Sequence, residues 1–300
     1  MPRKKRLNFD RESHIAAALF LAPALICIAI WFIYPLVQSV YISFFDFNYL
    51  FKDRAVFVGF ENYANMFLDS EFYKGLSHSI LFMLIVVPIQ TFLALLLATL
   101  VNQKIKGRGF FRAAYYMPYV LSAVAVATVF MYFFVKDQGV AKFLSFFGFK
   151  NTTWFADMNL AMPFIGILYI WQMLGFYMIY YLSGLQTIPG EIYEASQIDG
   201  ANKIQTFFFI TIPSLRHSTF LVVTYGIIQS FQIFDQIAVV TNSSGGPGSP
   251  AGATTTLLTY FYISSFKLYK MGYGSAVAIV LFLIILIVSI VQRRLVKMED

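Results

Sequence analysis

The sequence is poor in charge and almost free of cysteine. Asp, Glu, Lys and Arg make up 12% of its 300 residues, whereas soluble globular chains contain about 25%. Hydrophobic residues make up 59%, aromatic residues 19%, and the mean hydropathy is +0.68. This composition excludes an ordinary soluble domain. The single cysteine, Cys27, excludes an intrachain disulfide.

Motifs that carry chemistry are also missing. The sequence has no G-x-x-x-x-G-K-[ST] segment, so it lacks the loop that cradles nucleotide phosphates. It also lacks paired carboxylates, a histidine cluster or a Ser–His arrangement that would suggest catalysis. We therefore expect no enzyme activity, no bound metal and no cofactor in this chain.

What the sequence does contain is six long stretches without any Asp, Glu, Lys or Arg. A membrane-spanning helix needs about 20 mostly apolar residues, and helices satisfy their own backbone polar groups in the bilayer. We therefore predict an all-α polytopic membrane protein with six transmembrane helices. The fifth reaches full length only by including Asp235. The predicted spans are about 15–45, 77–101, 113–135, 159–184, 217–240 and 272–292.

The distribution of positive charge predicts the orientation. With the N-terminus in the cytoplasm, 14 of the 22 Lys and Arg residues fall on the inner side, as the positive-inside rule expects. Residues 1–14 form a basic cytoplasmic tail, 15–295 form one transmembrane domain, and both termini lie inside. These inner flanks account for the net charge of +7, and basic flanks usually meet anionic lipid. We expect no binding of nucleic acid.

Residues 185–216 form a polar connection between the fourth and fifth spans. Glu191 and Glu194 lie near a predicted helix start, where they favour the helix dipole. Asp199-Gly200 then breaks the helix, and Asp199 is expected to cap a second segment that begins at Ala201. Ala195, Ser196 and Ala201 are small enough for a partner to approach the backbone. The connection is either a docking surface or an amphipathic helix that rests on the membrane.

The order of residues here resembles a known motif. Glu194-Ala-Ser, three residues, Gly200, nine residues and Ile210-x-Ile-Pro213 resemble the EAA loop of ABC-importer permeases, with Ser196 and Ile212 as mild departures. The stretches Phe57–Tyr63 and Phe234–Ala276 resemble the same family, so the likeness covers nearly the whole chain. It is closest to carbohydrate-import permeases of the maltose, lactose and glycerol-phosphate type.

The resemblance implies a type I ABC importer permease fold, also called MetI-like, in which the 185–216 connection is a cytoplasmic coupling helix. It implies a bacterial or archaeal inner membrane and a sugar as substrate. The implied partners are a second permease subunit, two ATPase subunits that hold ATP and Mg²⁺, and an extracytoplasmic solute-binding protein. The expected coupling residues are Glu191, Glu194, Ala195, Ser196, Asp199, Gly200 and Ala201.

Two spans also contain candidate sugar contacts. Tyr225, Gln229, Gln232 and Gln236 would share one face of a continuous helix. Polar groups at this depth usually face a cavity or a neighbouring helix, so these residues either line the substrate path or join helices. The fourth span adds three weaker candidates, which are Trp171, Gln172 and Tyr177.

Other classes of protein remain as alternatives. An ion-coupled secondary carrier would need inverted repeats and several intramembrane charges, and a membrane-embedded enzyme would need clustered titratable groups. Asp235 is the only acidic residue within the spans. We interpret it as a structural acid near the outer boundary, tied to the Gly-rich turn that follows, in preference to a proton or cation relay.

Overall fold

The computed structural model describes residues 11–51, 53, 55–103, 106–242 and 245–297. The first ten residues of the predicted basic tail lie outside this range. The described chain is mostly helical, with one two-stranded antiparallel sheet. Its elements are α1 Arg11–Ile28, η1 Ala29–Ile33, α2 Tyr34–Ile42, β1 Phe45–Asp46, β2 Val56–Phe57, α3 Glu61–Leu68, α4 Ser70–Asn102, α5 Arg108–Val120, α6 Ala123–Phe133, α7 Gly139–Ser145, η3 Trp154–Ala156, α8 Ala161–Thr187, α9 Gly190–Ile198, α10 Lys203–Thr206, η4 Phe207–Thr211, α11 Ile212–Ser214, α12 Arg216–Phe231, α13 Asp235–Thr241, α14 Leu257–Tyr262, η6 Ile263–Lys267 and α15 Met271–Lys297.

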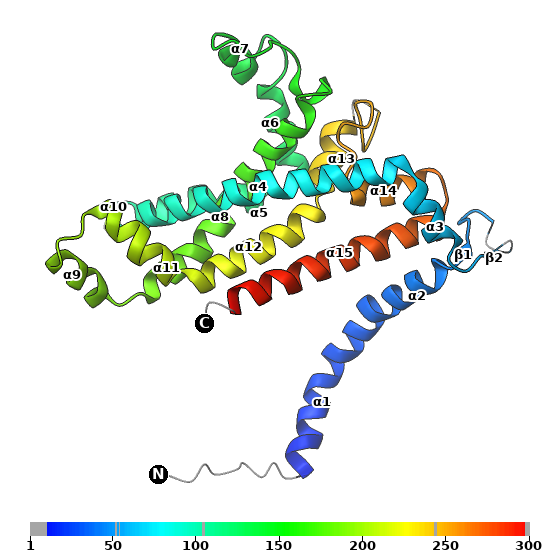
Figure 1. The fold of residues 1–300 in the computed structure, drawn as a ribbon, viewed down its shortest axis with the longest axis horizontal. Helices are drawn as coiled ribbons and strands as arrows, with labels where there is room; N and C mark the ends of the chain where they lie inside the picture. The colour runs from blue at the N-terminus through cyan, green and yellow to red at the C-terminus, as the bar shows by residue number, and fades with distance from the viewer. Residues whose placement is uncertain (1–10, 52, 54, 104–105, 243–244, 298–300) are drawn as a thin grey trace.

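Four helical stretches of the described chain are long and apolar enough to cross a membrane. They are Ala18–Ile42, Ser70–Asn102, Ala161–Thr187 and Met271–Arg294. They coincide with the first, second, fourth and sixth predicted spans. In Figure 1 α4, α8, α12 and α15 run along a common direction, while α1 and α2 form an arm that leaves the bundle.

The other two predicted spans are not continuous helices. Helices α5 and α6 meet at a bend of 101°, and the segment Lys203–Ser214 meets α12 at 70°. Helix α5 has 13 residues, which span only about 20 Å at 1.5 Å per residue. The predicted third span, about 113–135, is thus built from two helices that meet at a bend. Pro118 lies inside α5, and the Ser122 hydroxyl accepts from the Ala125 N–H to start α6 in a new direction.

The predicted fifth span, about 217–240, is likewise not one continuous helix. Helix α12 ends at Phe231, and α13 begins at Asp235 after a short non-helical link. Asp235 lies in the first turn of α13 and is exposed, so its charge favours the N-terminal end of that helix. This position replaces the predicted tie to the Gly-rich turn.

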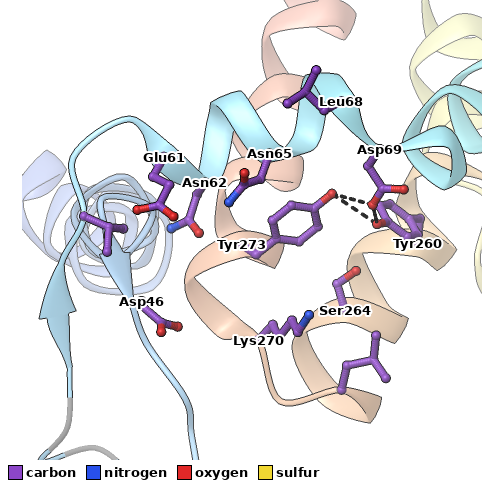
Figure 2. Close-up of a pocket in the computed structure, with 12 residues that line it drawn as sticks. Asp46, Glu61, Asn62, Asn65, Leu68, Asp69, Tyr260, Ser264, Lys270 and Tyr273 are labelled. Carbon is purple, nitrogen blue, oxygen red and sulfur yellow. Dashed lines mark hydrogen bonds between the residues drawn. The ribbon is translucent and has the colours of Figure 1, made fainter.

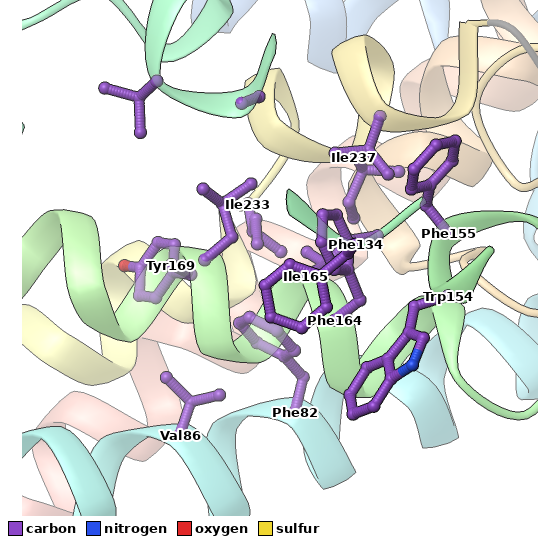
Figure 3. Packing of buried hydrophobic residues seen from close by; sticks show 14 of the residues in the cluster. Phe82, Val86, Phe134, Trp154, Phe155, Phe164, Ile165, Tyr169, Ile233 and Ile237 are labelled. Atoms are coloured by element: carbon purple, nitrogen blue, oxygen red, sulfur yellow. The ribbon is translucent and has the colours of Figure 1, made fainter. Parts of the chain in front are cut away.

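Aromatic packing holds the bent segments against the bundle. Phe134 lies at the end of α6, with its ring centroid 5.1 Å from Phe164 of α8 and 5.2 Å from Trp154 of η3. Phe82 of α4 meets Tyr169 of α8 at 5.6 Å (Figure 3). Edge-on aromatic pairs at these distances are favourable beyond the area that they bury. The first two pairs hold α6 and the 134–157 connection against the N-terminal half of α8.

Helix α5 lies directly on α8 at a glycine. A Cβ atom at Gly175 would overlap the backbone of Tyr115 and Tyr116. Small residues allow helices in membranes to approach this closely. Gly175 therefore sets the separation between the two helices.

The two ends of the bundle carry different structures. At one end, β1, β2 and α3 form a small cap, and at the other end lie α9 and α10 (Figure 1). Residues 254–266 contain α14 and part of η6, and they pack against α4 and α15. The cap and the α9–α10 connection are thus separated by the length of the long helices.

Candidate functional site

The first candidate site is the connection around α9. Pro189 precedes the helix, Glu191 lies in its first turn, and Glu191 and Glu194 are both exposed. The helix is short and projects beyond the ends of α4 and α8 (Figure 1). An exposed helix with carboxylates near its start presents a polar surface that a cationic partner surface can contact.

Helix α9 ends in a glycine turn that the sequence predicts well. Gly200 has φ +80°, in the left-handed region that glycine adopts easily. The Gly200 N–H donates to the Gln197 carbonyl at 3.1 Å, and the Ala201 N–H donates to the Ser196 carbonyl at 2.9 Å. This pair of bonds is a Schellman motif. The chain is thereby reversed without a long flexible loop.

The cap of the next helix differs from the prediction. Asn202, not Asp199, caps α10: the Gln205 N–H donates to Asn202 Oδ1 at 2.9 Å, and the Asn202 N–H donates to Gln205 Oε1 at 2.8 Å. This is a complete capping box. Asp199 ends α9 instead and is exposed. Helix α10 therefore begins at Lys203, two residues after the predicted start at Ala201.

The expected small residues do not all face outward. Ser196 is 4% exposed and its hydroxyl donates to the Tyr193 carbonyl at 2.8 Å, so it belongs to the inner face of α9. Tyr193 approaches the Thr211 hydroxyl at 3.4 Å and links α9 to η4. Ala195 is exposed and Ala201 is half-buried. The outward surface therefore contains Glu191, Glu194 and Ala195, but not Ser196.

The intramembrane polar residues form two groups instead of one stripe. Because the helix breaks between α12 and α13, Gln236 is not on the face that carries Tyr225. Gln236 is buried and donates through Nε2 to Gln172 Oε1 at 2.9 Å, which joins α13 to α8. Gln229 is half-buried and Gln232 is exposed at the break. Trp171 is 44% exposed, with its ring 5.6 Å from Phe130.

The second group surrounds Tyr225. Its ring lies 5.1 Å from Phe176 and 6.2 Å from Tyr177, and Tyr119 stacks on Phe176 at 4.5 Å. Helices α8 and α12 line an open cavity of about 210 Å³ beside these rings. Tyr177 and Tyr225, predicted separately from two different spans, are thus brought together.

Gln90, the buried amide of α4, was not among the predicted site residues. It has 0% exposure, and within the described part of the chain neither Nε2 nor Oε1 has a hydrogen-bond partner of ordinary geometry, although Tyr177 lies close enough to interact. A Cβ at Gly226 would lie 3.0 Å from its Nε2. The sequence did contain a signal for it: Gln90 is a single amide within a long apolar run, and a buried amide needs a hydrogen-bonding partner.

A third candidate lies at the cap end of the bundle. Asp69 accepts hydrogen bonds from the Tyr260 hydroxyl and, at 2.8 Å, from the Tyr273 hydroxyl (Figure 2). Burial alone would raise the pKa of Asp69, but these bonds and the Glu71 N–H lower it below its ordinary value. Burial and the neighbouring carboxylate raise the pKa of Tyr260 to about 12. Asp69 is therefore ionised at neutral pH and Tyr260 remains a donor.

No metal centre is found in the described residues, since no group of three His, Cys, Asp or Glu side chains converges. The geometry instead combines a projecting helix, a helical bundle and polar residues between spans. Comparison of the sequence with known proteins identifies the family to which a chain with these features belongs. Residues 64–298 match the family described as "Binding-protein-dependent transport system inner membrane component".

The chain belongs to this family. It is therefore the membrane component of a transport system that works with a binding protein, and it is a multi-pass membrane protein, not an enzyme. The family resemblance and the all-α permease fold inferred from the EAA-like motif are confirmed.

Named relatives of this permease extend over its whole length. It is 36% identical to the sulfoquinovosyl glycerol transport system permease protein SmoG of Agrobacterium fabrum, over 100% of this chain and 96% of that protein. It is 34% identical to the multiple sugar-binding transport system permease protein MsmF of Streptococcus mutans, over 93% and 94%.

The permease fold is also that of a solved transporter. The chain superimposes with a TM-score of 0.80 on a chain of a bacterial alginate ABC transporter, solved in complex with an alginate pentasaccharide-bound periplasmic protein. The match covers 98% of this chain and 99% of the other at 21% identity. The likeness establishes the fold of the permease.

Proposed function

We propose that this chain is one permease subunit of an ATP-driven importer of sugars or oligosaccharides. The observation that supports this most directly is the relatedness over the full chain to permeases named for sugar transport. An energy source has to come from elsewhere, since the sequence has no phosphate-binding loop. ATP and Mg²⁺ then belong to two separate ATPase subunits.

In this proposal the α9 connection is the contact with an ATPase subunit. Glu194 supplies a charged contact from its exposed position, and the Schellman turn at Gly200 holds α9 at a fixed angle to α10. Both termini and this connection are cytoplasmic, and the β1–β2–α3 cap is external. Closure of the two ATPase subunits would then move the α9 helices and rock the spans around the substrate path.

The proposed substrate path passes the two polar groups between α8, α12 and α13. The rings around Tyr225 and Tyr177 offer aromatic faces with hydroxyls, and Gln172, Gln229, Gln232 and Gln236 offer amides farther along. Gln236 and Gln172 bond to each other, so these two amides can bind sugar only when that bond opens. If it stays closed, they serve as a contact between helices.

Two further partners complete the proposal. The arm of α1 and α2 exposes its apolar side chains along the candidate span Ala18–Ile42, of which 0% is buried. A second permease subunit and membrane lipid would cover it. A binding protein would deliver the sugar to the cap end. An ion-coupled carrier is disfavoured, since no group of three His, Cys, Asp or Glu side chains converges in the described residues.

Reconstitution tests the proposal. The chain would be placed in proteoliposomes with its second permease, ATPase and binding protein, and uptake of maltose, lactose and arabino-oligosaccharides would be measured with and without ATP inside. We expect uptake of at least one sugar that requires both ATP and the binding protein. Uptake by this chain alone, driven by a proton or sodium gradient, would refute it.

A further inference from the structure

A polar cavity of about 580 Å³ opens at the cap end of the bundle, and none of the residues of the proposed substrate path lines it. The cap supplies one wall through β1 and α3, and the segment from α14 to the start of α15 supplies the other (Figure 2). Its volume lies in the range of small-molecule sites, roughly 300 to 1,000 Å³.

The walls of this cavity are rigid because some polar groups are already used. Asn62 donates from Nδ2 to the carbonyl oxygens of Ser43 at 2.8 Å and Phe45 at 2.9 Å, which fastens α3 to the chain before β1. Asp69 fastens the start of α4 to Tyr260 and Tyr273. A site whose walls are held in this way needs little rearrangement to bind a ligand.

Other polar groups at the cavity are free to bind a ligand. Ser264 is 1% exposed, lines the cavity, and its hydroxyl makes no hydrogen bond of ordinary geometry with any described residue, although Tyr260 is near. Leaving a buried hydroxyl unpaired is unfavourable. Asp46, Glu61 and Asn65 also line the cavity, are exposed and make no side-chain hydrogen bond or ion pair within the described residues.

The mixture of groups indicates the class of ligand. Carboxylate acceptors, the Asn65 amide, the Ser264 hydroxyl and the Lys270 ammonium surround one volume, which suits a molecule that both donates and accepts many hydrogen bonds. The carboxylates do not converge as a metal site would. Three carboxylates against one ammonium leave a negative balance that repels anions.

We propose that this external cavity binds an uncharged mono- or disaccharide, as a site separate from the path through the spans. Ser264, Asn65 and Glu61 would bind sugar hydroxyls, and the ring of Tyr273 would lie against the sugar. The lining of the cavity indicates an uncharged polyol, and the choice of a sugar among the polyols rests on the proposed function. The site would retain sugar near the mouth of the transporter after the binding protein opens.

Ligand-detected saturation-transfer NMR on the full complex in nanodiscs, without binding protein, tests this. The neutral probes are maltose, lactose and arabinobiose, and the contrasting probes are glucuronate and N-methylguanidinium. We expect saturable binding of at least one neutral probe and at least tenfold weaker binding of glucuronate. Asn65→Ala and Ser264→Ala should each weaken binding about two- to tenfold, the worth of one hydrogen bond.

Glu71→Gln is the matched control, since Glu71 belongs to the same end of the molecule but does not line the cavity. It should bind like wild type, and Ser264→Ala should keep the thermal midpoint of wild type. Three results would overturn the site: no neutral probe binds, only N-methylguanidinium binds, or both cavity variants bind normally. ATP-driven uptake that persists in any of these cases leaves the importer function standing.

Discussion

Gln236 of α13 donates a hydrogen bond to Gln172 of α8 at 2.9 Å, just after the break that separates α12 from α13. The two side chains are buried. The bond joins the short helix α13 to α8, and it adds to the packing of Ile237 and Val240, which are fully buried in the same core. It explains how the broken fifth span keeps its position.

A double-mutant cycle measures this bond. Gln236→Leu and Gln172→Leu should each lower stability in detergent, and the double variant should lose less than the sum, with a coupling free energy of about 0.6 to 1.7 kcal/mol, as for other hydrogen bonds between spans. Thermal unfolding of the purified complex gives the values. Gln229→Leu paired with Gln172→Leu is the control and should be additive; coupling of equal size there would mean that the pair has no special role.

The glycine turn after α9 gives a second prediction. Gly200 has φ +80° and open space around its Cα, so Gly200→Ala meets only backbone strain, worth about 1–2 kcal/mol. We expect weaker association with the ATPase subunit, seen as loss of ATPase during size-exclusion chromatography. Gly190→Ala also meets no neighbour but needs no positive φ, and it should retain the ATPase. Equal behaviour of the two variants would show that the turn does not matter.

The contact between α5 and α8 gives a third prediction. A methyl group at Gly175 would overlap the backbone at Tyr115, whereas at Gly166 its nearest neighbour would be a Val86 methyl at 3.6 Å. Gly175→Ala should therefore force the helices apart and reduce the yield of folded protein severalfold, because overpacking a fitted contact typically costs 1–3 kcal/mol. Gly166→Ala should express like wild type. Fluorescence-detected chromatography compares them, and normal yield of Gly175→Ala would contradict this packing.

Acid should loosen the cap through Asp69. Burial opposes its ionisation, but hydrogen bonds from Tyr260, Tyr273 and the Glu71 N–H bring its pKa below the ordinary value near 3.9. A lowered pKa in the folded state adds stability above pH 4, and this stability is lost as pH falls through the folded pKa. The thermal midpoint should therefore fall steeply below pH 4.

Asp69→Asn removes this titration, so the thermal midpoint of that variant should fall less steeply below pH 4. Glu71→Gln should keep the steep fall of the wild type. In both variants the thermal midpoint should still fall somewhat with acid, because a hydrogen bond from Lys150 also lowers the pKa of Asp157. Identical slopes for wild type and Asp69→Asn would mean that the Asp69 network does not stabilise the cap. Scanning fluorimetry from pH 3 to 7 makes the comparison.

Long apolar runs predicted α4, α8 and α15 well, because spanning length and burial follow directly from composition. The two bends were not predicted. Pro118 and Ser122 marked the first, but the break after Phe231 has neither proline nor glycine, and it depends on contacts such as Gln236 with Gln172 that only the folded chain brings together. An unbroken apolar pattern does not distinguish a straight span from a bent one.

In the α9 connection, the neighbouring residues in the sequence were enough to predict where α9 ends, but not where α10 begins. Gly200 was predicted because few other residues tolerate its backbone conformation. Asp199 and Asn202 are both good caps, and only Asn202 has Gln205 three residues later to complete a capping box. The cavity near Ser264 could not be predicted, because its walls are far apart in the sequence.

The central claim is that α9 touches an ATPase subunit on the cytoplasmic side. In a Cys27→Ser background, Glu194→Cys would be tested in cells and in the purified complex with a short bifunctional maleimide–amine cross-linker, and Asn65→Cys at the cap would be the control. We predict that Glu194→Cys cross-links to the ATPase and resists a membrane-impermeant maleimide in intact cells, while Asn65→Cys does the reverse. Labelling of Glu194→Cys from outside, with no cross-link to the ATPase, would contradict the account.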